Sequence, residues 1–399
     1  MSGGAGCEEG PLATPQDDVL NYLIPQSPNP PITPAAIRPG FLAVRAGRLP
    51  FGQVLLPLGP ARGQFWIINH APNALMTMKR FATALRPFCA ALLLTGATAA
   101  TPAAAYAAPA PATVVADNPA QHPNFTVRVV GKGRPVLLIP GLTCPGAVWD
   151  ETVARYQQQY QCHVVSLAGF GGAPAPASTD KLMQSVRDQL LAYIKTQQLQ
   201  RPAVIGHSLG GFLALWMSTT QPEAIGPLVI VDSLPFLSAV QNPAMTAEQA
   251  KPMAENMRQQ MSKGKMTMAA ERQMVSSLVA DTAARTRVAR WGLASDPATV
   301  AQAMYDLSTT DLRQELGRIQ QPVLVLGSWA AYKPYGSTKE STRAIFAQQY
   351  AQLPQHRIEM SEGGYHFLMY DDTKWYLDLA GSFLQQHAPA KGKAKGKNS

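Results

Sequence analysis

Short apolar runs alternate with longer stretches of helical periodicity along residues 125 to 387. Strict alternation of apolar and polar side chains predicts a half-buried strand at Phe125–Val130. Continuous apolar runs, typical of strands buried on both faces, follow at residues 136–139, 162–167, 203–205, 228–231 and 323–326, and a shorter strand is predicted at 357–360. Helical stretches lie between them at about 149–160, 180–197, 209–220, 339–351 and 372–387. This order predicts an α/β fold, in which a mostly parallel sheet is flanked by helices on both faces.

One interval, about 236–318, breaks the alternation with several helical stretches and no convincing strand. We interpret it as an inserted helical cap. Met253, Met257 and Met261 are spaced four residues apart and therefore share one helical face. Methionines at this spacing usually pack in a core, and the alternative is an adaptable apolar lining for a moderately hydrophobic small-molecule substrate. Trp149 and Phe236 are candidate substrate-binding residues, although ordinary core positions explain them equally well.

The segment before residue 108 carries a different kind of pattern. A basic start at Lys79 and Arg80, an apolar stretch of 13 residues at 88–100 and a small-residue end at 105–107 are the three parts of a secretory signal peptide. The apolar stretch is shorter than the roughly 20 residues that cross a bilayer. Residues 76–107 therefore predict a secreted or periplasmic protein without a transmembrane segment.

The two ends of the chain show no sustained helical or strand period. Residues 1–75 are rich in Pro and Gly, which predicts either disorder or an over-extended reading frame with the true start at Met76 or Met78. Residues 388–399 form a Lys-rich, low-complexity tail that we also predict to be disordered. The predicted folded domain is therefore 108–387.

The distribution of charge along the chain bears on whether a nucleic acid is a binding partner. The formal net charge is +9, but the N-terminal 107 residues hold seven basic and four acidic residues, and the tail adds four lysines. Without both ends, 23 basic and 21 acidic residues remain. The folded part thus gives no reason to expect a nucleic-acid partner. It contains neither metal-ligand spacing nor Gly-x-Gly-x-x-Gly after a strand, so no metal and no nucleotide cofactor are predicted.

Ser208 stands in the run Gly206-His207-Ser208-Leu209-Gly210, directly after a short apolar strand and before a helix. This is the strand–turn–helix context that a nucleophile elbow requires. Bulkier residues at 206 and 210 would clash with adjoining backbone. The first amides of the following helix are aimed at charge that develops near Ser208. The pattern therefore predicts a nucleophilic serine.

With these flanks, residues 124–387 resemble the α/β-hydrolase superfamily, whose members commonly carry a helical cap. A second segment, from Gly133 to Leu142 and followed by Trp149, resembles the loop that supplies one oxyanion-hole amide in that family. The resemblance implies that the amides of Leu142 and Leu209 bind the oxyanion. Pro140 replaces the His that the family usually carries in this loop.

The resemblance also places the general base late in the chain. His366 follows the short strand at 357–360, after a Gly-Gly pair, and precedes the last helix. It alone among seven histidines has this order and context. His207, inside the elbow, is predicted to lend backbone rather than base chemistry.

The acid that orients His366 is the least determined position. The family usually places it after the strand at 323–326, but no carboxylate occurs there before Glu340. Asp232 ends the strand one earlier in the chain, a position that some members use. Asp232 is therefore the candidate acid, and Glu340, Glu362 or a Ser–His pair without a close acid stay as alternatives.

Together these residues predict a serine hydrolase that cleaves a carboxylic ester through an acyl-enzyme on Ser208, with His366 as general base and no cofactor. An amide- or peptide-cleaving or acyl-transferring enzyme would use the same residues. A non-catalytic binding protein of this fold is the alternative from another class. Cys144 and Cys162 are predicted to stay unpaired, because a strand of about 16 Å would separate them.

The signal-peptide hypothesis predicts the mass of the natural exported protein. We expect a mature chain that begins near residue 108, because cleavage follows the Ala-x-Ala end. Intact-mass measurement of protein from the native host checks this, and a mature form that retains residue 1 contradicts it.

Overall fold

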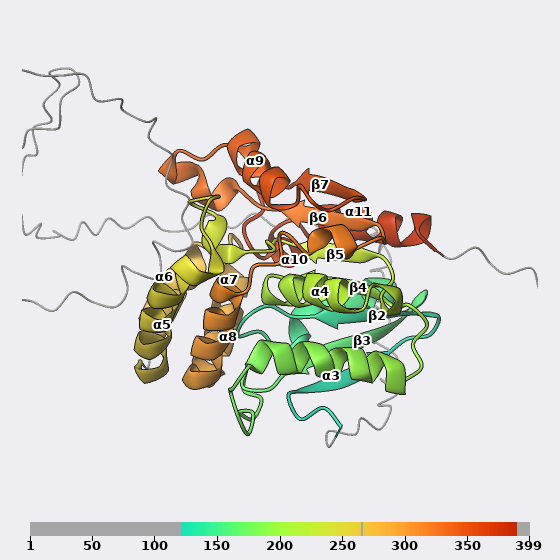
Figure 1. The fold of residues 1–399 in the computed structure, drawn as a ribbon, viewed down its shortest axis with the longest axis horizontal. Helices are drawn as coiled ribbons and strands as arrows, with labels where there is room; N and C mark the ends of the chain where they lie inside the picture. The colour runs from blue at the N-terminus through green and yellow to red at the C-terminus, as the bar shows by residue number, and fades with distance from the viewer. Residues whose placement is uncertain (1–120, 265, 389–399) are drawn as a thin grey trace, which may run out of the picture. The chain divides into compact units, whose positions relative to one another are not determined.

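The computed structural model describes residues 121–388 except residue 265, so the predicted segments 1–75 and 76–107 and the tail from 389 onward lie outside the described residues. Within them one seven-stranded sheet has the order β1-β3-β2-β4-β5-β6-β7 (Figure 1). The strands are β1 (Phe125–Val130), β2 (Arg134–Ile139), β3 (Tyr160–Leu167), β4 (Ala203–His207), β5 (Leu228–Val231), β6 (Val323–Gly327) and β7 (His356–Met360). Only β1 runs antiparallel to its neighbour, β3. The predicted mostly parallel sheet is confirmed.

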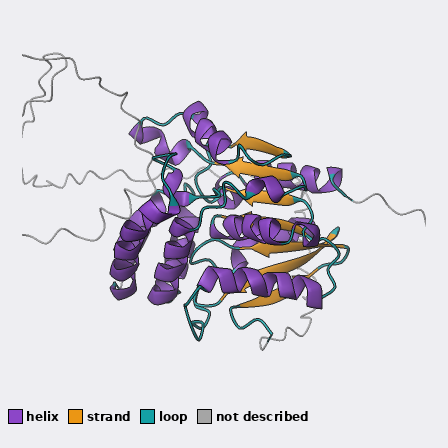
Figure 2. Ribbon diagram, in the orientation of Figure 1, coloured by secondary structure: helices purple, strands orange, loops and turns teal. Residues whose placement is uncertain are grey.

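Helices cover both faces of the sheet (Figure 2). Outside the cap they are α2 (Asp150–Tyr156), α3 (Leu182–Thr196), α4 (Leu209–Thr220), α9 (Lys339–Gln349), α10 (Leu368–Asp371) and α11 (Thr373–Gln386). Short 3₁₀ turns occur at Gly146–Trp149, Pro222–Ala224 and Ala330–Tyr335, and at the two ends of the cap interval at Leu237–Ala239 and Leu316–Arg318. Leu137 and Ile139 of β2 share a core with α3, α4 and α9. Val136 and Leu138 share the opposite core with α2 and α11. Burial on both sides explains why the strands are continuous apolar runs.

The two cysteines of the described residues are free thiols, as predicted from their places along the sheet. Cys162 lies in β3, and Cys144 lies in the loop after β2. Both are fully buried, and burial raises the pKa of each thiol to about 12. Both thiols therefore stay protonated and unreactive at neutral pH.

No described helix is long and apolar enough to cross a membrane.

The cap lies between β5 and β6 and consists of α5 (Ala247–Lys263), α6 (Met268–Ser276), α7 (Thr282–Ala294) and α8 (Pro297–Thr309). Each helix begins after a Thr or Asp whose side chain accepts a hydrogen bond from the third helical amide; these N-caps are Thr246, Thr267, Asp281 and Asp296. Such a cap replaces an acceptor that the first turn lacks, and each stabilises a helix by about 1 kcal/mol. The predicted inserted helical cap is confirmed.

The cap is bound to the edge of the sheet where the parallel strands end, the edge toward which the strand arrows point in Figure 1. The Ser295 hydroxyl lies 3.3 Å from the carbonyl oxygen of Thr143, in the loop after β2. The amide of Asp296 donates to the carbonyl of Gly169, in the loop after β3, over 2.7 Å. The junction between α7 and α8 therefore rests on two of the loops that follow strands.

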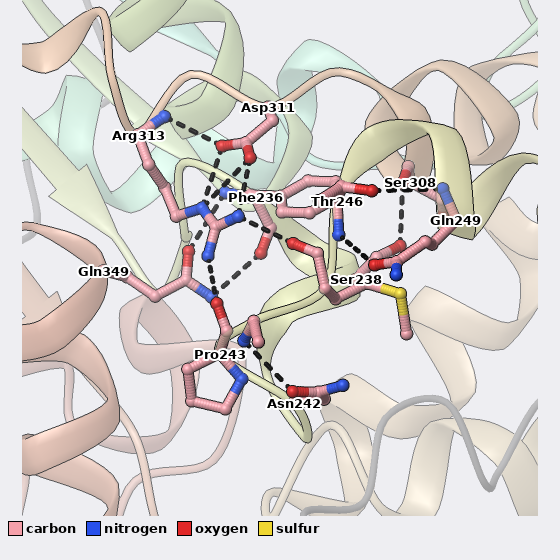
Figure 3. A network of polar contacts seen from close by, with 12 residues as sticks. Phe236, Ser238, Asn242, Pro243, Thr246, Gln249, Ser308, Asp311, Arg313 and Gln349 are labelled. Carbon is pink, nitrogen blue, oxygen red and sulfur yellow. Dashed lines mark hydrogen bonds and ion pairs between the residues drawn. The ribbon is translucent and has the colours of Figure 1, made fainter.

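Arg313 holds the base of the cap together (Figure 3). Its guanidinium pairs with Asp311 over 2.6 Å and donates to the carbonyls of Pro243 and Met245 over 2.7 and 2.8 Å. It also lies 4.9 Å from the ring centroid of Phe236. Arg313, which follows the last cap helix, thus binds the segment that precedes the first cap helix.

Glu271 is an ionisable group buried inside the cap. Its side chain packs against α7 so closely that a Cβ on Gly292 would overlap the carboxyl group. The residue is 4% exposed, and burial alone accounts for the shift in the pKa of its carboxyl. Burial raises its pKa from 4.5 to about 7, because a charged carboxylate loses hydration there.

This burial predicts a pH-dependent stability. Between pH 4.5 and about 7 the folded protein binds more protons at Glu271 than the unfolded chain does, so stability falls as the pH rises through this window. Glu271→Gln removes the effect. Its melting temperature relative to the parent should rise by at least about 2 °C from pH 4.5 to pH 8, the equivalent of ~1 kcal/mol in a domain of this size.

Glu248→Gln is the matched control, because the Glu248 side chain on α5 is 80% exposed. We expect its melting temperature to track the parent at every pH. A Glu271→Gln difference that stays constant from pH 4.5 to pH 8 contradicts the prediction.

Candidate active site

Ser208 occupies the turn between β4 and α4 in a strained conformation, with φ 51° and ψ −120°. Positive φ is costly for a residue with a Cβ and persists only where the surroundings fix it. Its amide donates to the carbonyl of Val231 over 2.9 Å, and its own carbonyl accepts from Phe212 over 3.0 Å. Ser208 is half-buried, whereas His207 and Leu209 on either side are fully buried. The turn therefore presents the serine side chain at the end of the sheet.

Two glycines make this turn possible. A Cβ on Gly206 would overlap the carbonyl oxygen of Gly210, and a Cβ on Gly210 would overlap the carbonyl oxygen of Ile139 at the end of β2. The start of α4 thus packs directly against the neighbouring strand, as the sequence predicts. A Cβ on Gly141 would lie 3.2 Å from the Cβ of Ser208, so the loop after β2 passes beside the serine.

The predicted oxyanion donors lie on the two backbone segments that meet at this point. Leu209 is the first residue of α4, where amides have no acceptor within the helix and where the helix dipole is positive. Leu142 follows Gly141 and is half-buried, and its amide donates to no acceptor among the described residues. Neither amide has an acceptor among the described residues, and oxyanion binding by this pair stays a prediction.

Asp232 and His366 are in direct contact. The distance from Oδ2 of Asp232 to Nδ1 of His366 is 2.7 Å, and the two side chains are 8% and 21% exposed. Asp232 directly follows β5 at a positive φ of 45°, and its amide donates to the carbonyl of Leu326 over 2.7 Å. His366 lies in the loop between β7 and α10. The contact thus spans the end of β6.

Ser328 also binds the carboxylate of Asp232. Its amide donates to Oδ1 of Asp232 over 2.7 Å, and its hydroxyl donates to Oδ2 over 2.8 Å. Ser328 directly follows β6, the place where the family resemblance puts the acid, and it is 1% exposed. A buried donor therefore stands where an acid was expected, and it orients an acid from the next strand.

The other two acids considered from the sequence do not reach His366. Glu362 has a side chain that is 82% exposed, and it pairs with Lys339. Glu340 lies exposed in the first turn of α9, where hydrogen bonds from its own amide and from Thr338 lower the pKa of its carboxyl. Among the three candidate acids, the structure brings only Asp232 to the histidine.

Most of the described residues match a known protein family. Residues 136–379, more than half of the chain, match the sequence model of the Alpha/beta hydrolase family. The chain belongs to this family. The pimeloyl-[acyl-carrier protein] methyl ester esterase of Aliivibrio salmonicida is 26% identical over 262 residues, which cover 61% of this chain and 95% of that protein. The protein of the same name from Nitrosomonas europaea is 29% identical over 212 residues, or 51% of this chain and 79% of that protein.

Solved structures show the same fold. An esterase from Exiguobacterium antarcticum aligns with a TM-score of 0.54 at 17% identity and covers 65% of this chain and 95% of its own. The enol-lactonase from Burkholderia xenovorans aligns with a TM-score of 0.53 at 15% identity and covers 65% and 96%. At these identities the comparison supports the α/β-hydrolase fold alone. The geometry of the site is given by the contacts described above.

His207 contributes more to the site of this hydrolase than the sequence indicated. Its ring is fully buried, and its Nε2 donates to the backbone carbonyl of His366 over 3.0 Å. The two imidazole rings lie 4.7 Å apart. Burial, reinforced by the neighbouring His366, holds the pKa of His207 well below 6.5. A neutral His207 therefore supports the loop of His366 through its side chain as well as its backbone.

Trp149 and Phe236 lie in the core instead of in a substrate-binding surface. Both are 0% exposed, so no molecule of the size of water touches them. Trp149 packs against Tyr376 of α11, with ring centroids 6.4 Å apart. Phe236 lies under Arg313, and its backbone exchanges two hydrogen bonds with the side chain of Gln349 over 2.9 and 3.2 Å (Figure 3). Their ordinary role in packing accounts for both residues.

The methionine face of α5 is likewise not a continuous lining. Met253 is 51% exposed and Met257 is 9% exposed, while Met261 is half-buried. α5 packs against α8, and of the three methionines only Met257 is buried. The three methionines do lie on one helix, α5. Their spacing alone does not show which of them is buried.

The close approach at the elbow predicts how this hydrolase tolerates added methyl groups. Gly210→Ala should cost about 1–3 kcal/mol of unfolding free energy, because the Ile139 carbonyl must move. Gly363→Ala is the matched control, since a Cβ there meets nothing within 4 Å. Urea unfolding of both variants checks this, and equal stability of the two is the contrary result.

Proposed function

We propose that this α/β hydrolase cleaves carboxylic esters through an acyl-enzyme on Ser208. The observation that carries the proposal is the 2.7 Å contact between Asp232 and Nδ1 of His366. A carboxylate can only accept there, so Nδ1 carries the proton and Nε2 is left as the basic nitrogen. A histidine oriented in this way can activate a hydroxyl nucleophile, and Ser208 stands on a strained turn at the same edge of the sheet.

In the first half-reaction, Nε2 of His366 accepts the Ser208 proton while Oγ attacks the ester carbonyl carbon. Negative charge develops on the carbonyl oxygen, and the amides of Leu142 and Leu209 stabilise it. Each donor of this kind contributes about 10²–10³ in rate, or roughly 3–4 kcal/mol. The protonated histidine then donates its proton to the departing alcohol, which leaves an acyl group on Ser208.

In the second half-reaction, His366 removes a proton from water as the water attacks the acyl-enzyme. The same amides hold the oxyanion, and the histidine returns the proton to Ser208 as the carboxylic acid leaves. Asp232 takes up no proton in either half-reaction, and Ser328 donates to both of its oxygens. The acid thereby stabilises the imidazolium that forms twice in each cycle.

The choice of an ester is supported by the relatives. Two proteins that align over most of their own lengths are named methyl ester esterases. Esters have better leaving groups than amides, so a site of this kind acts on them most readily. A small-molecule ester with a moderately hydrophobic acyl group is the substrate that we propose, and amide cleavage is the alternative on the same residues.

Two substitutions test the assignment. Ser208→Ala should abolish turnover of p-nitrophenyl esters and labelling by a fluorophosphonate probe, because the nucleophile is gone. Asp232→Asn should lower kcat by about 10³–10⁴-fold, because the histidine loses the partner that fixes its tautomer. Circular dichroism should show that both variants keep the fold.

Two outcomes contradict the proposal. If the parent protein neither reacts with the probe nor turns over any p-nitrophenyl ester of graded chain length, a non-catalytic binding protein is favoured. If Asp232→Asn stays within a few-fold of the parent, Asp232 does not orient the base. Anilide analogues run beside the esters measure the preference between ester and amide directly.

A further inference from the structure

Asp371, at the end of α10, binds two segments that are far apart in the sequence. Its carboxylate accepts from the amides of Ala280 and Asp281, each over 2.9 Å, and from the amide of Tyr365 over 3.1 Å. Residues 278–281 lie between α6 and α7, and we call them the cap turn. Residues 361–367 carry His366, and we call them the base loop. One carboxylate therefore joins the cap turn to the base loop.

A second bond joins the same two segments. The amide of Phe367 donates to the carbonyl of Leu278 over 3.2 Å. The residues immediately before and after His366, Tyr365 and Phe367, are thus both tied by their amides to this assembly. The carbonyl of His366 itself accepts from His207. The backbone around the base is therefore held by the cap on one side and by the elbow on the other.

The cap turn is also held from inside the cap. Arg285, in the first turns of α7, donates from Nε to the carbonyl of Val279 over 2.6 Å and from Nη2 to the carbonyl of Ala280 over 3.2 Å. Arg285 thus binds the carbonyls of the turn, while Asp371 binds its amides. Each of these hydrogen bonds has one charged partner, either Arg285 or Asp371. Such bonds are stronger than those between two neutral groups. The turn has little freedom to move without moving its partners.

We propose that Asp371 is a positioning residue that makes the placement of His366 depend on the position of the cap. A cap that shifts as substrate enters moves residues 278–281, and the bonds to Asp371 and Phe367 pass that shift to the base loop. His366 is then aligned with Ser208 only when the cap is in place. This proposal rests on the proposed function, in which His366 is the general base. A purely structural Asp371 would stabilise the cap without affecting the base.

The test replaces Arg285, which binds the cap turn and does not contact the base loop through any bond named above. Arg285→Gln leaves Asp371 and the base loop chemically unchanged, and it loosens only the cap turn. We expect faster hydrogen exchange in peptides that cover 278–281 and also in peptides that cover 361–371. A small fluorophosphonate, which is too small to need the cap for binding, should label Ser208 about 5- to 10-fold more slowly. Asp371→Asn should show both effects more strongly.

The double variant makes the test quantitative. If one linkage carries both effects, the fold-loss in labelling for Arg285→Gln with Asp371→Asn is smaller than the product of the two single losses. Asp378→Asn is the matched control, because Asp378 pairs on the surface of α11 with Lys374. We expect this control to keep the parental labelling rate and exchange.

Two results overturn the coupling. In one, Arg285→Gln raises exchange in 278–281 alone and leaves the labelling rate at the parental value. In the other, the two single losses multiply in the double variant. Failure of the proposed function is distinct, because then the parent itself is not labelled at Ser208, while the exchange comparison still reports whether the two segments are linked.

Discussion

The hydrogen bond between Asp232 and His366 is the contact on which the whole site depends, and the sheet makes it possible. Three backbone bonds continue the sheet beyond its strands: Ser208 to Val231 at 2.9 Å, Asp232 to Leu326 at 2.7 Å, and Ser361 to Gly327 at 3.0 Å. They fix the first residues after β4, β5 and β7 against neighbouring strands. Because parallel strands all end at one edge, nucleophile, acid and base loop meet there. The register of β4 to β7 therefore sets the geometry of the chemistry.

Local sequence was enough to predict the strands and helices, whereas the catalytic roles of Ser208 and His366 stay predictions. Strands such as Leu228–Val231 are buried on both faces, so their apolar runs are unambiguous. Ser208 could be proposed because Gly206 and Gly210 stand on either side of it after an apolar strand, and His366 because the family resemblance places the base late in the chain. The strands and helices predicted from such local patterns are confirmed.

The remaining parts depend on contacts between distant residues. The sequence favoured Asp232 but left Glu340 and Glu362 open, because the choice depends on how far each side chain lies from His366 across β6. Ser328 and Asp371 carry no motif, and their roles appear only when separate loops meet. Trp149 and Phe236 were ambiguous for the same reason, since only tertiary packing decides whether an aromatic residue faces a core or a substrate.

The most direct measurement of the central claim is proton NMR of the Nδ1 hydrogen that His366 shares with Asp232. The account predicts a far-downfield signal in the parent that persists in Ser208→Ala and disappears in both Asp232→Asn and His366→Gln. A signal that survives in Asp232→Asn, or a parent spectrum without one across the pH range in which the protein is folded, contradicts the account.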